Sequence, residues 1–450
     1  MKHIGLAVAL LVCAAAVAAA ADDASRVRSI TLRNGLQVLL LPDPQATAAN
    51  VAVWYRAGTR TEAAGRTGMS RMVGLLMYGG SSPAAEERRR LQAGGATFNA
   101  TVNPDYSCFQ QTLPCESVEL ALRLEADHMK SLSVTQDDLE TGRGAVREEP
   151  RRRLAGNTVG LGLRRLYAIA FADHPYSRPA SGLEEDLGRI TLEDAQAYFR
   201  ERYAPQNALL TVVGCFDPEP TLAAVRRYFE PLAPRPSPRP PALRLQAQRG
   251  ERRGFETAPA PGPLLLVGWR GPGSADPDGP ALELLSLAIS SGPSSRLSRL
   301  RAAHPGLVAL VQGDFDRSRE ASLIFCMAAV PARAESAAAE SVLVAGIERL
   351  AVQPVSDEEL DRVKRKAEAA RVFGLQTVRG RAEALGAAQI LDGDYGAAAK
   401  QLDRIRALTA ADLKRAAARV LQAGARSVVW IMPPQAPEAS PAPGGRGGRP

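Results

Sequence analysis

Two helix-opening patterns recur in the second half of the 450-residue chain at almost the same spacing, and this repeat constrains the fold more than any other feature. Thr191 to Asp194 opens an expected helix that an apolar strand follows, and Thr409 to Asp412 does the same 218 positions later. The segment that starts at Thr135 is echoed by the one that starts at Ser356, 221 positions later. Two nearly equal offsets from independent matches predict a duplicated domain. We therefore expect an α+β fold made of two tandem homologous α/β lobes.

Composition sets the expected boundaries of these lobes. Residues 22–230 form the first lobe and residues 264–432 the second. Between them, residues 231–263 are rich in Pro and Arg and lack periodicity, which is typical of an extended linker. Residues 433–450 consist mainly of Pro, Ala, Gly and Arg, and we expect a disordered tail there.

The first 21 residues have the pattern of a secretory signal peptide. A short basic start precedes an alanine-rich apolar run that ends in small residues at Ala20 and Ala21. This run is short for a spanning helix, and no later stretch is long and apolar enough to cross a bilayer. We expect the mature chain to be periplasmic or secreted, without stable membrane insertion.

Four cysteines remain after residue 21, namely Cys108, Cys115, Cys215 and Cys326. An oxidising compartment would permit disulfides, but the spacing specifies none. Cys108 and Cys115 are close enough in sequence to pair. The favoured interpretation is nevertheless four small buried side chains.

The net charge of +8 raises the question of nucleic-acid binding. The arginines are interspersed with glutamates, as in the segment from Glu86 to Arg90, which indicates a solvated surface. We expect no nucleic-acid partner.

Periodicity predicts the elements of the first copy. They are a β-hairpin at 30–40 around Asn34 and Gly35, strands at 50–55, 96–101 and 106–112, and helices within 68–80 and at 84–93, 116–132 and 135–154. Pro150 has no N–H to donate, so we expect the last helix to kink or restart directly after Glu149.

The helix within 68–80 has a distinctive sequence context. Around it lie Trp54–Gly58, Asn99–Thr101, Asp105, Tyr106 and Arg143–Glu149. This order and spacing resemble the insulinase and pitrilysin-type zinc peptidases, the family of mitochondrial processing peptidase and of the core subunits of respiratory complex III. In that family the helix carries H-x-x-E-H, in which two histidines hold zinc and the Glu activates water, and a distant Glu is the third ligand.

When this chain is aligned with the pattern, the positions of the two histidines and of the catalytic Glu hold other residues. The first His becomes Arg71, the catalytic Glu becomes Gly74 and the second His becomes Leu75, whereas Glu149 keeps the position of the distant ligand. Arg has no lone pair for a metal, Gly has no side chain and Leu has no ligand atom. The resemblance therefore implies no catalytic residue and no zinc in this chain, with zinc expected only in a partner subunit.

No other histidine motif supplies a replacement. No histidine lies one helical turn from another His or from a Cys, so no second zincin-like motif can be built. His174 stands beside a proline in a loop, and we interpret it as structural. The four histidines are His3, His128, His174 and His304.

The resemblance also implies a shape and a partner. Two such lobes form half of a clam-shell chamber, the mitochondrial processing peptidase-like metallohydrolase fold, and the same chain, a copy or a paralogue supplies the other half. Many bacterial members work as pairs in which one subunit has lost the zinc motif. The partner expected here is a paralogous zinc-bearing peptidase subunit, and the ligand is a peptide substrate.

Two places in the chain are candidates for substrate contact. The segment that contains Arg296 matches one in which non-catalytic subunits carry a substrate-binding Arg, although a surface arginine is an equal alternative. Asn99 and Ala100 lie on the segment where family members lay an extended peptide on a free strand edge. The alternative is a strand that is already covered within the fold.

The leading hypothesis is thus a non-catalytic, substrate-binding or chamber-forming subunit. The alternatives are a zinc metalloendopeptidase active in its own right and a structural or assembly subunit. With the metal gone, we expect Arg71 and Glu149 to form a salt bridge across the vacated site, because an unpaired buried carboxylate is costly. The alternative is that Arg71 points to solvent and Glu149 pairs with Arg147 or Arg152.

Overall fold

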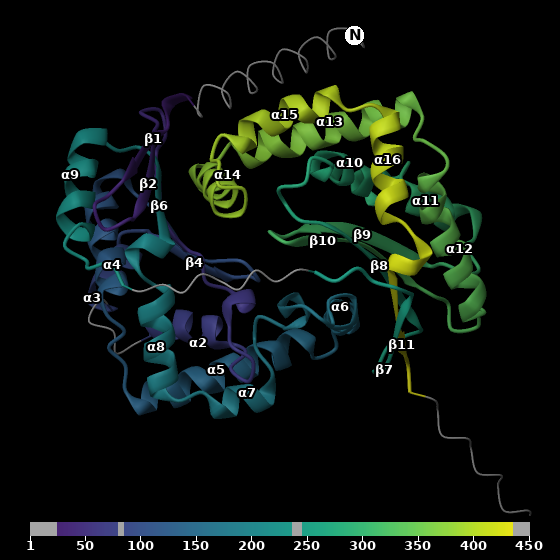
Figure 1. Cartoon of the computed structure of the whole chain (residues 1–450), viewed down its shortest axis with the longest axis horizontal. Coiled ribbons are helices and arrows are strands. Elements are labelled where there is room, and N and C mark those ends of the chain that lie inside the picture. Colours follow the sequence, from purple (N-terminus) through teal and green to yellow (C-terminus); the bar gives the residue numbers. More distant parts are fainter. Residues whose placement is uncertain (1–24, 80–84, 236–244, 435–450) are drawn as a thin grey trace, which may run out of the picture.

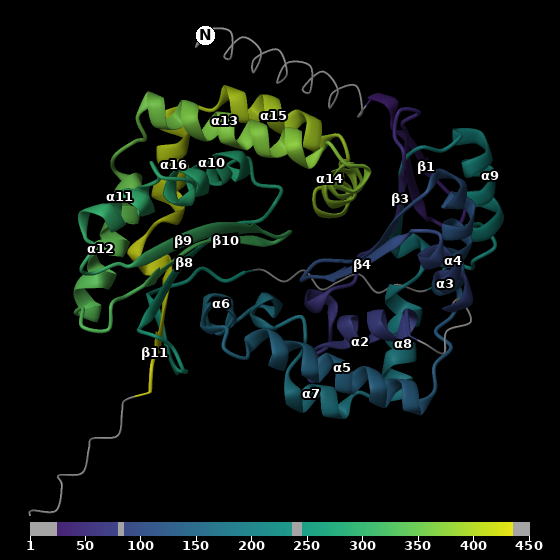
Figure 2. The ribbon, with the colours of Figure 1, turned by 180° about the vertical axis from the view of Figure 1, so that it is seen from behind.

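The computed structural model describes residues 25–79, 85–235 and 245–434. The expected signal peptide at 1–21 and residues 435–450 of the expected tail lie outside the described residues. Two lobes, each a mixed sheet with helices packed on it, stand side by side (Figure 1). Figure 2 shows the same arrangement from behind.

The first sheet has six strands in the order β1-β2-β6-β3-β5-β4. Its strands are β1 Arg28–Thr31, β2 Gln37–Pro42, β3 Ala49–Tyr55, β4 Thr97–Val102, β5 Ser107–Leu113 and β6 Ala208–Gly214. β2 and β6 are parallel, and the other neighbours are antiparallel. The hairpin predicted around Asn34 is confirmed, with Ile30 opposite Val38.

The second sheet has five strands in the order β7-β11-β8-β10-β9. They are β7 Arg252–Thr257, β8 Leu264–Pro272, β9 Leu310–Arg317, β10 Ala321–Ala329 and β11 Arg426–Met432. Its order and strand directions repeat those of β2-β6-β3-β5-β4, including one parallel pair, β7 with β11. The duplication is thus confirmed. The expected linker at 231–263 is wrong in part, because β7 lies inside it and completes the second sheet.

Helices α2 to α8 of the first lobe recur in the same order as α10 to α16 in the second, and α9 has no counterpart among the described helices. The first lobe contributes α2 Met69–Met77, α3 Ala85–Ala93, α4 Val118–Lys130, α5 Gln136–Leu154, α6 Thr158–Ala170, α7 Glu184–Arg189, α8 Leu192–Arg202 and α9 Pro218–Phe229. The second contributes α10 Gly279–Ser290, α11 Arg296–Ala303, α12 Ser336–Glu348, α13 Asp357–Gly374, α14 Val378–Leu391, α15 Ala397–Ala407 and α16 Ala410–Val420. Short 3-10 turns lie at Thr59–Thr61, Cys115–Ser117, Pro175–Ser177, Pro205–Asn207, Arg349–Ala351 and Ala423–Ala425.

The predicted helix starts are confirmed by their caps. Thr135, Thr191 and Thr409 each accept a hydrogen bond from the backbone three residues later and complete a capping box, and Ser356 caps α13. A restart of the helix after Glu149 is wrong, because α5 runs through Pro150 to Leu154, whereas a kink at this position stays a prediction.

One helix of each lobe packs against the sheet of the other lobe. Leu166 of α6 packs with Leu266 and Val429 of the second sheet, and Leu385 of α14 packs with Trp54 and other residues of the first sheet. Both helices approach so closely that a side chain does not fit at the contact. A Cβ at Gly162 would lie 2.5 Å from Leu266, and one at Gly386 would lie 2.2 Å from the Trp54 ring. The exchange joins the two lobes through apolar contacts.

A buried polar cluster also joins the lobes. Arg60 donates to Asp105 at 3.0 Å and to Glu320 of the second lobe at 2.9 Å. The backbone N–H of Arg319 donates to the same Asp105 at 2.8 Å. His174 Nδ1 accepts from the backbone of Tyr176, so its Nε2 carries the proton and donates to Glu320 at 2.7 Å. His174 is therefore structural, as the sequence indicated.

The cysteines contradict the expectation of four free thiols. Cys115 and Cys215 form a disulfide with a Cα–Cα distance of 5.3 Å, whereas Cys108 and Cys326 are free and buried. The pair is separated by 100 residues. The fold brings the end of β6 against the turn that precedes α4, a contact that spacing alone does not reveal.

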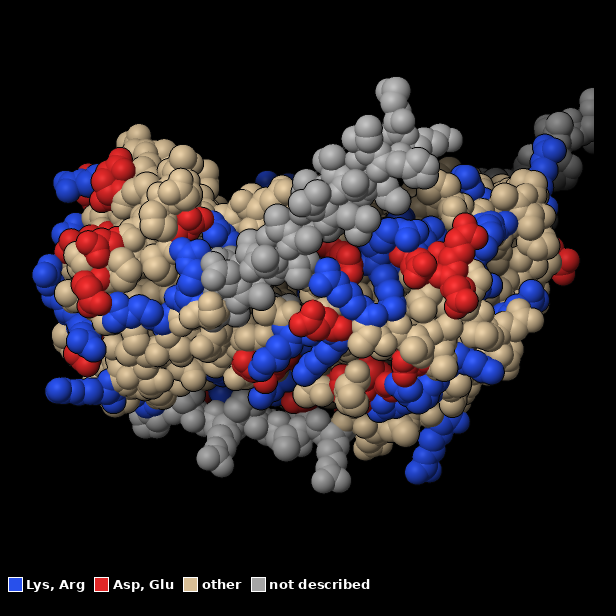
Figure 3. Space-filling view, turned by 90° about the horizontal axis from the view of Figure 1, so that it is seen from above, with Lys and Arg blue, Asp and Glu red and all other residues tan. Residues whose placement is uncertain are grey.

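Basic and acidic side chains are intermingled on the face seen in Figure 3, in keeping with a solvated surface. Across the described ranges, the model contains no helix with both the length and the apolar character that a bilayer crossing requires.

Candidate functional site

The start of helix α2 is held by a buried carboxylate. Glu62 accepts from the backbone N–H of Gly68 and of Ser70, each at 2.8 Å. Burial raises the pKa of Glu62, and the two N–H donors partly offset this rise. A carboxylate at a helix N-terminus also interacts favourably with the helix dipole. These contacts fix α2, and with it Arg71, in place against the first sheet.

Arg71 and Glu149 form the salt bridge that the sequence predicted. Arg71 Nη2 and Nε both donate to Glu149 Oε2, at 2.5 and 3.1 Å. The two side chains are 24% and 34% exposed, so the pair is partly buried. Arg153 Nη1 lies 3.8 Å from the other carboxylate oxygen. Arg147, one of the alternative partners considered for Glu149, forms an ion pair with Glu184 instead.

The other two metal-site positions are filled by packing. A Cβ on Gly74 would lie only 3.2 Å from the ring of Phe109, closer than ordinary packing allows. Leu75 packs against the core of the first lobe. Any side chain at position 74 would therefore require the Phe109 ring to shift by a few tenths of an ångström.

The zinc that the family's active members hold does not fit this residue set. The position of the first ligand holds a guanidinium that is already bonded to Glu149, and the positions of the base and second ligand offer no donor atom. In the part of the chain that the structure describes, no three His, Cys, Asp or Glu residues lie together as a metal-binding group.

The second lobe contains a corresponding ion pair between two helices, with the positions of the acid and the arginine exchanged. Arg371 of α13 donates to both oxygens of Glu283 of α10, at 3.0 and 2.8 Å. In the repeat, α10 and α13 take the places of α2 and α5. In both lobes an ion pair thus links these two helices. In the first lobe the ion pair lies at the positions that correspond to zinc ligands in the family. The repeat offset of 221 carries Glu149 to position 370, one residue before Arg371, but it carries Arg71 to Gly292 rather than to Glu283, so the offset alone does not reveal this pair.

Asn99 and Ala100 lie on β4, which is an edge strand of the first sheet. They face Gln110 and Phe109 of β5, and among the described strands β4 has no neighbour on its other side. Ala100 is exposed and Asn99 is half-buried. The expected edge is therefore present, and its use by a peptide stays a prediction.

Arg296 is placed at the start of α11, away from the residues around Arg71. Its Nε and Nη2 donate to the two oxygens of Glu359 at 2.9 and 2.6 Å. Arg299 donates to the same carboxylate at 2.8 Å. The guanidinium is thus engaged within the second lobe, and a substrate contact by Arg296 stays a prediction.

A pocket of about 450 Å³ opens beside the Arg71–Glu149 pair. It lies where α2, the end of β4, α5 and α6 meet the loop at 176–181 and β9 of the second lobe. In Figure 2, α2, α5 and α6 lie below β4, toward this meeting point. Its lining includes Arg71, Val102, Pro104, Glu149, Arg153, Asn157, Arg164, Tyr167, Arg178 and Asp316.

Sequence reasoning missed most of this lining. Tyr167 of α6 donates to Asp316 of β9 at 2.5 Å, and burial raises the pKa of both groups. The two residues belong to different lobes and are 149 positions apart. Their meeting depends on the exchange of α6 onto the second sheet, for which the sequence has no local signal.

Two family descriptions match the chain. "Insulinase (Peptidase family M16)" matches residues 37–182, and "Peptidase M16 inactive domain" matches residues 189–367. The zinc protease PqqE of Helicobacter pylori is 25% identical over 389 residues, which cover 84% of this chain and 88% of that protein.

Solved structures share the fold. A protease from Helicobacter pylori superposes with a TM-score of 0.85 at 24% identity, over 90% of this chain and 99% of that one. A peptidase M16 inactive domain from Pseudomonas fluorescens superposes with a TM-score of 0.81 at 17% identity, over 91% and 98%. The expected α+β fold with two M16-type lobes is thereby confirmed.

Proposed function

The chain belongs to the insulinase family of peptidases, peptidase family M16, and we propose that it is a non-catalytic member that binds peptides and completes a chamber with a zinc-bearing paralogue. The observation that carries this proposal is the Arg71–Glu149 pair at the metal position. A zinc peptidase needs ligands with lone pairs and a general base beside the metal. This chain has a bonded guanidinium at one ligand position and a glycine packed on Phe109 at the position of the base.

Peptide binding is supported by the free edge of β4. An edge strand presents unpaired N–H and C=O groups, to which an extended peptide can add as a further strand. β4 ends at Val102, beside the pocket around Arg71. A peptide on this edge would thus pass the vacated metal site without meeting a hydrolytic group of this chain.

The two-lobed shape supports the proposed role of a partner. Two lobes of this family make half of a chamber, and a half-chamber does not surround a peptide. The two lobes are joined by the exchange of α6 and α14 and by the cluster around Asp105, which supports the proposal that one chain forms one side of such a chamber. We propose that a paralogue with an intact H-x-x-E-H motif supplies the opposite wall and the zinc.

An exported location is supported by the disulfide between Cys115 and Cys215. Disulfides persist in oxidising compartments such as the periplasm and are rare in the cytosol. Together with the signal-peptide pattern at 1–21, this favours a periplasmic or secreted protein.

The test is made with the purified mature chain, alone and co-expressed with a neighbouring zinc-bearing paralogue. We expect less than stoichiometric zinc by elemental analysis, no cleavage of unfolded peptides by the chain alone, and higher turnover by the pair than by the paralogue alone. About one zinc per chain with chelator-sensitive cleavage would instead favour a peptidase active in its own right, as the name of the Helicobacter pylori relative suggests. A stable complex without any change in turnover would favour a structural subunit.

A further inference from the structure

The pocket beside Arg71 lies at the end of the strand on which a peptide would lie. Val102 is the last residue of β4, and both Val102 and Pro104 line the pocket. A peptide paired along the free edge therefore has one of its side chains, or its terminus, at the mouth of this pocket. The pocket volume of about 450 Å³ is large enough for a side chain with its hydrating waters.

The charged residues of this pocket are unbalanced. Its lining contains four arginines, Arg71, Arg153, Arg164 and Arg178, and two carboxyl groups, Glu149 and Asp316. Both carboxyl groups are already bonded: Glu149 accepts twice from Arg71, and Asp316 accepts from Tyr167. Arg71 offsets the charge of Glu149, whereas the neutral hydroxyl of Tyr167 only hydrogen-bonds Asp316. The four arginines still outnumber the two carboxyl groups, so the lining has an excess of positive charge.

Two of these arginines are available to a ligand. Arg164 of α6 is exposed, and no hydrogen bond or ion pair joins its guanidinium to another residue of the described ranges. Arg153 is 79% exposed and has only the longer contact of 3.8 Å to Glu149. Arg178 is more restricted, because it donates to the backbone carbonyl of Glu62 at 3.0 Å.

The amino end of α6 adds to the positive field. Its cap Asn157 and its first-turn residue Gly160 both line the pocket. Helix N-termini carry a partial positive charge that favours anions. A carboxylate is small, planar and acceptor-only, and it matches the donor fork of an arginine.

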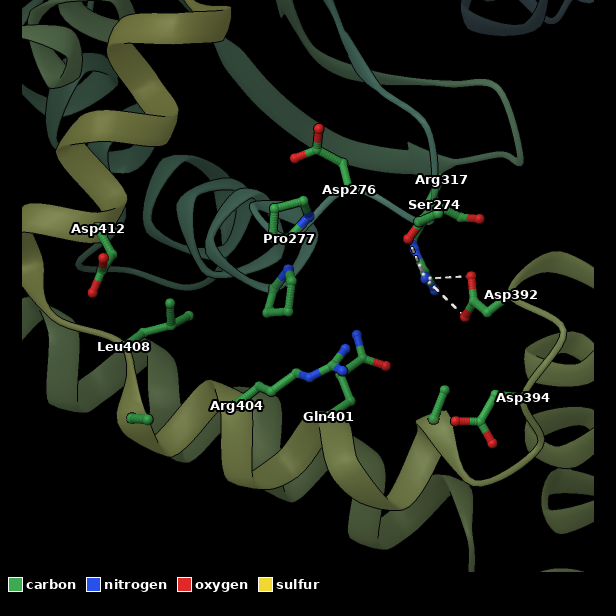
Figure 4. A pocket seen from close by; sticks show the side chains of 14 residues that line it. Ser274, Asp276, Pro277, Arg317, Asp392, Asp394, Gln401, Arg404, Leu408 and Asp412 are labelled. Carbon is green, nitrogen blue, oxygen red and sulfur yellow. Dashed lines mark hydrogen bonds and ion pairs between the residues drawn. The ribbon is translucent and has the colours of Figure 1, made fainter.

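The second lobe contains a pocket of opposite character. It has a volume of about 660 Å³ and its lining includes four aspartates and two arginines (Figure 4). Arg317 points to Asp392 there and donates to both of its oxygens at 2.9 Å. An acidic group would be repelled in that pocket, so a carboxylate is not favoured in every pocket of the described residues. The pocket that adjoins the one beside Arg71 shares Arg164 with it and also has more arginines than carboxyl groups.

We propose that this pocket, which we call the arginine pocket, binds a carboxylate of the peptide that lies on β4 and so makes the chain selective for peptides with an acidic group. This inference rests on the proposed peptide-binding function and names its substrate class. The carboxylate can come from an Asp or Glu side chain or from the C-terminus of the peptide. Arg164 and Arg153 are the residues that contact it.

The test measures the binding of short fluorescein-labelled synthetic peptides to the full mature chain by fluorescence anisotropy. Three otherwise identical peptides are compared: one with an internal Glu and an amidated C-terminus, one with Gln in its place and a free C-terminus, and one with Gln and an amidated C-terminus. The proteins are the native chain, the double variant Arg153→Gln/Arg164→Gln, and the control Arg301→Gln. Arg301 is an exposed arginine of α11 that lies outside the arginine pocket.

We expect at least one carboxylate peptide to bind about three- to tenfold more tightly than the fully neutral peptide, as partly exposed charge pairs allow. The peptide that shows this preference identifies the source of the carboxylate. The double variant should lose the preference and keep the affinity for the neutral peptide, whereas Arg301→Gln should keep both. The preference should also weaken as salt is raised.

Two other outcomes overturn the inference in distinguishable ways. If all three peptides bind equally, or if the preference survives in the double variant, the arginine pocket is not selective, while the proposed peptide binding stands. If the native chain binds none of the peptides, the proposed function fails together with the inference.

Discussion

Arg71 of α2 donates twice to one oxygen of Glu149 in α5, and this pair joins two helices that a metal would otherwise join. Among the described residues, the charged group nearest to the second oxygen of Glu149 is the Arg153 guanidinium, at 3.8 Å. The sequence predicted the pair but not that a single carboxylate oxygen accepts both hydrogen bonds. Removing one partner of a pair that is about one quarter to one third exposed should cost less than in a buried pair and more than in a fully exposed one.

A double-mutant cycle on Arg71→Ala and Glu149→Ala should give a coupling free energy of about 1 kcal/mol, because the two groups are in direct contact. The measurement is the free energy of unfolding in urea for the native chain, both single variants and the double variant. Arg153→Ala is the control, and its coupling to Glu149 should stay below about 0.5 kcal/mol because that contact is long and exposed. Strictly additive losses for Arg71 and Glu149 would contradict a stabilising pair.

Exchanging the acid and the arginine of the Arg71–Glu149 pair should preserve the ion pair between α2 and α5. The second lobe already has the acid on the first helix and the arginine on the later one, as Glu283 and Arg371. The double variant Arg71→Glu/Glu149→Arg should therefore recover most of the stability that either single reversal loses, each of which places like charges together. Thermal unfolding of the three variants checks this, and a double variant as unstable as the single ones would show that the helix geometry accepts only one orientation.

The close approach of α14 to the first sheet should not tolerate a side chain. A Cβ at Gly386 would lie 2.2 Å from the Trp54 ring, so Gly386→Ala should destabilise the chain by about 1–3 kcal/mol or more. Gly144→Ala in α5 is the matched control: nothing lies within 4 Å of its Cβ, and higher helix propensity should stabilise it by about 0.5–1 kcal/mol. Urea unfolding compares the two, and equal effects would mean that α14 does not depend on this contact.

The disulfide should contribute to stability through the long loop that it closes. Breaking the Cys115–Cys215 bond, which spans 100 positions, should cost about 2–5 kcal/mol, although the mechanism of such effects is model-dependent. The native chain should therefore melt at a lower temperature in a reductant. The double variant Cys115→Ala/Cys215→Ala should not respond to the reductant. A native chain that melts identically in both conditions would show that the bond is absent in solution.

Several features could be derived from the sequence because they depend on residues that are close together. Hydrophobic periodicity and capping boxes are local, so the hairpin at Asn34 and the helix starts at Thr135, Thr191 and Thr409 were predicted correctly. The repeat offset revealed the duplication, and chemical type alone excluded Arg71, Gly74 and Leu75 as zinc ligands. The Arg71–Glu149 pair followed from one further step, the cost of leaving a carboxylate unpaired.

Other features were decided only when the chain folded. An apolar helix face indicates that α6 and α14 are buried, but not that each packs on the sheet of the other lobe. The partners of Cys115 and Arg296 and the tie between Tyr167 and Asp316 likewise join segments that are far apart in sequence. Periodicity reports whether a side chain is buried or exposed, whereas the partner of a side chain is set by which surfaces meet, and that is a property of the whole packed structure.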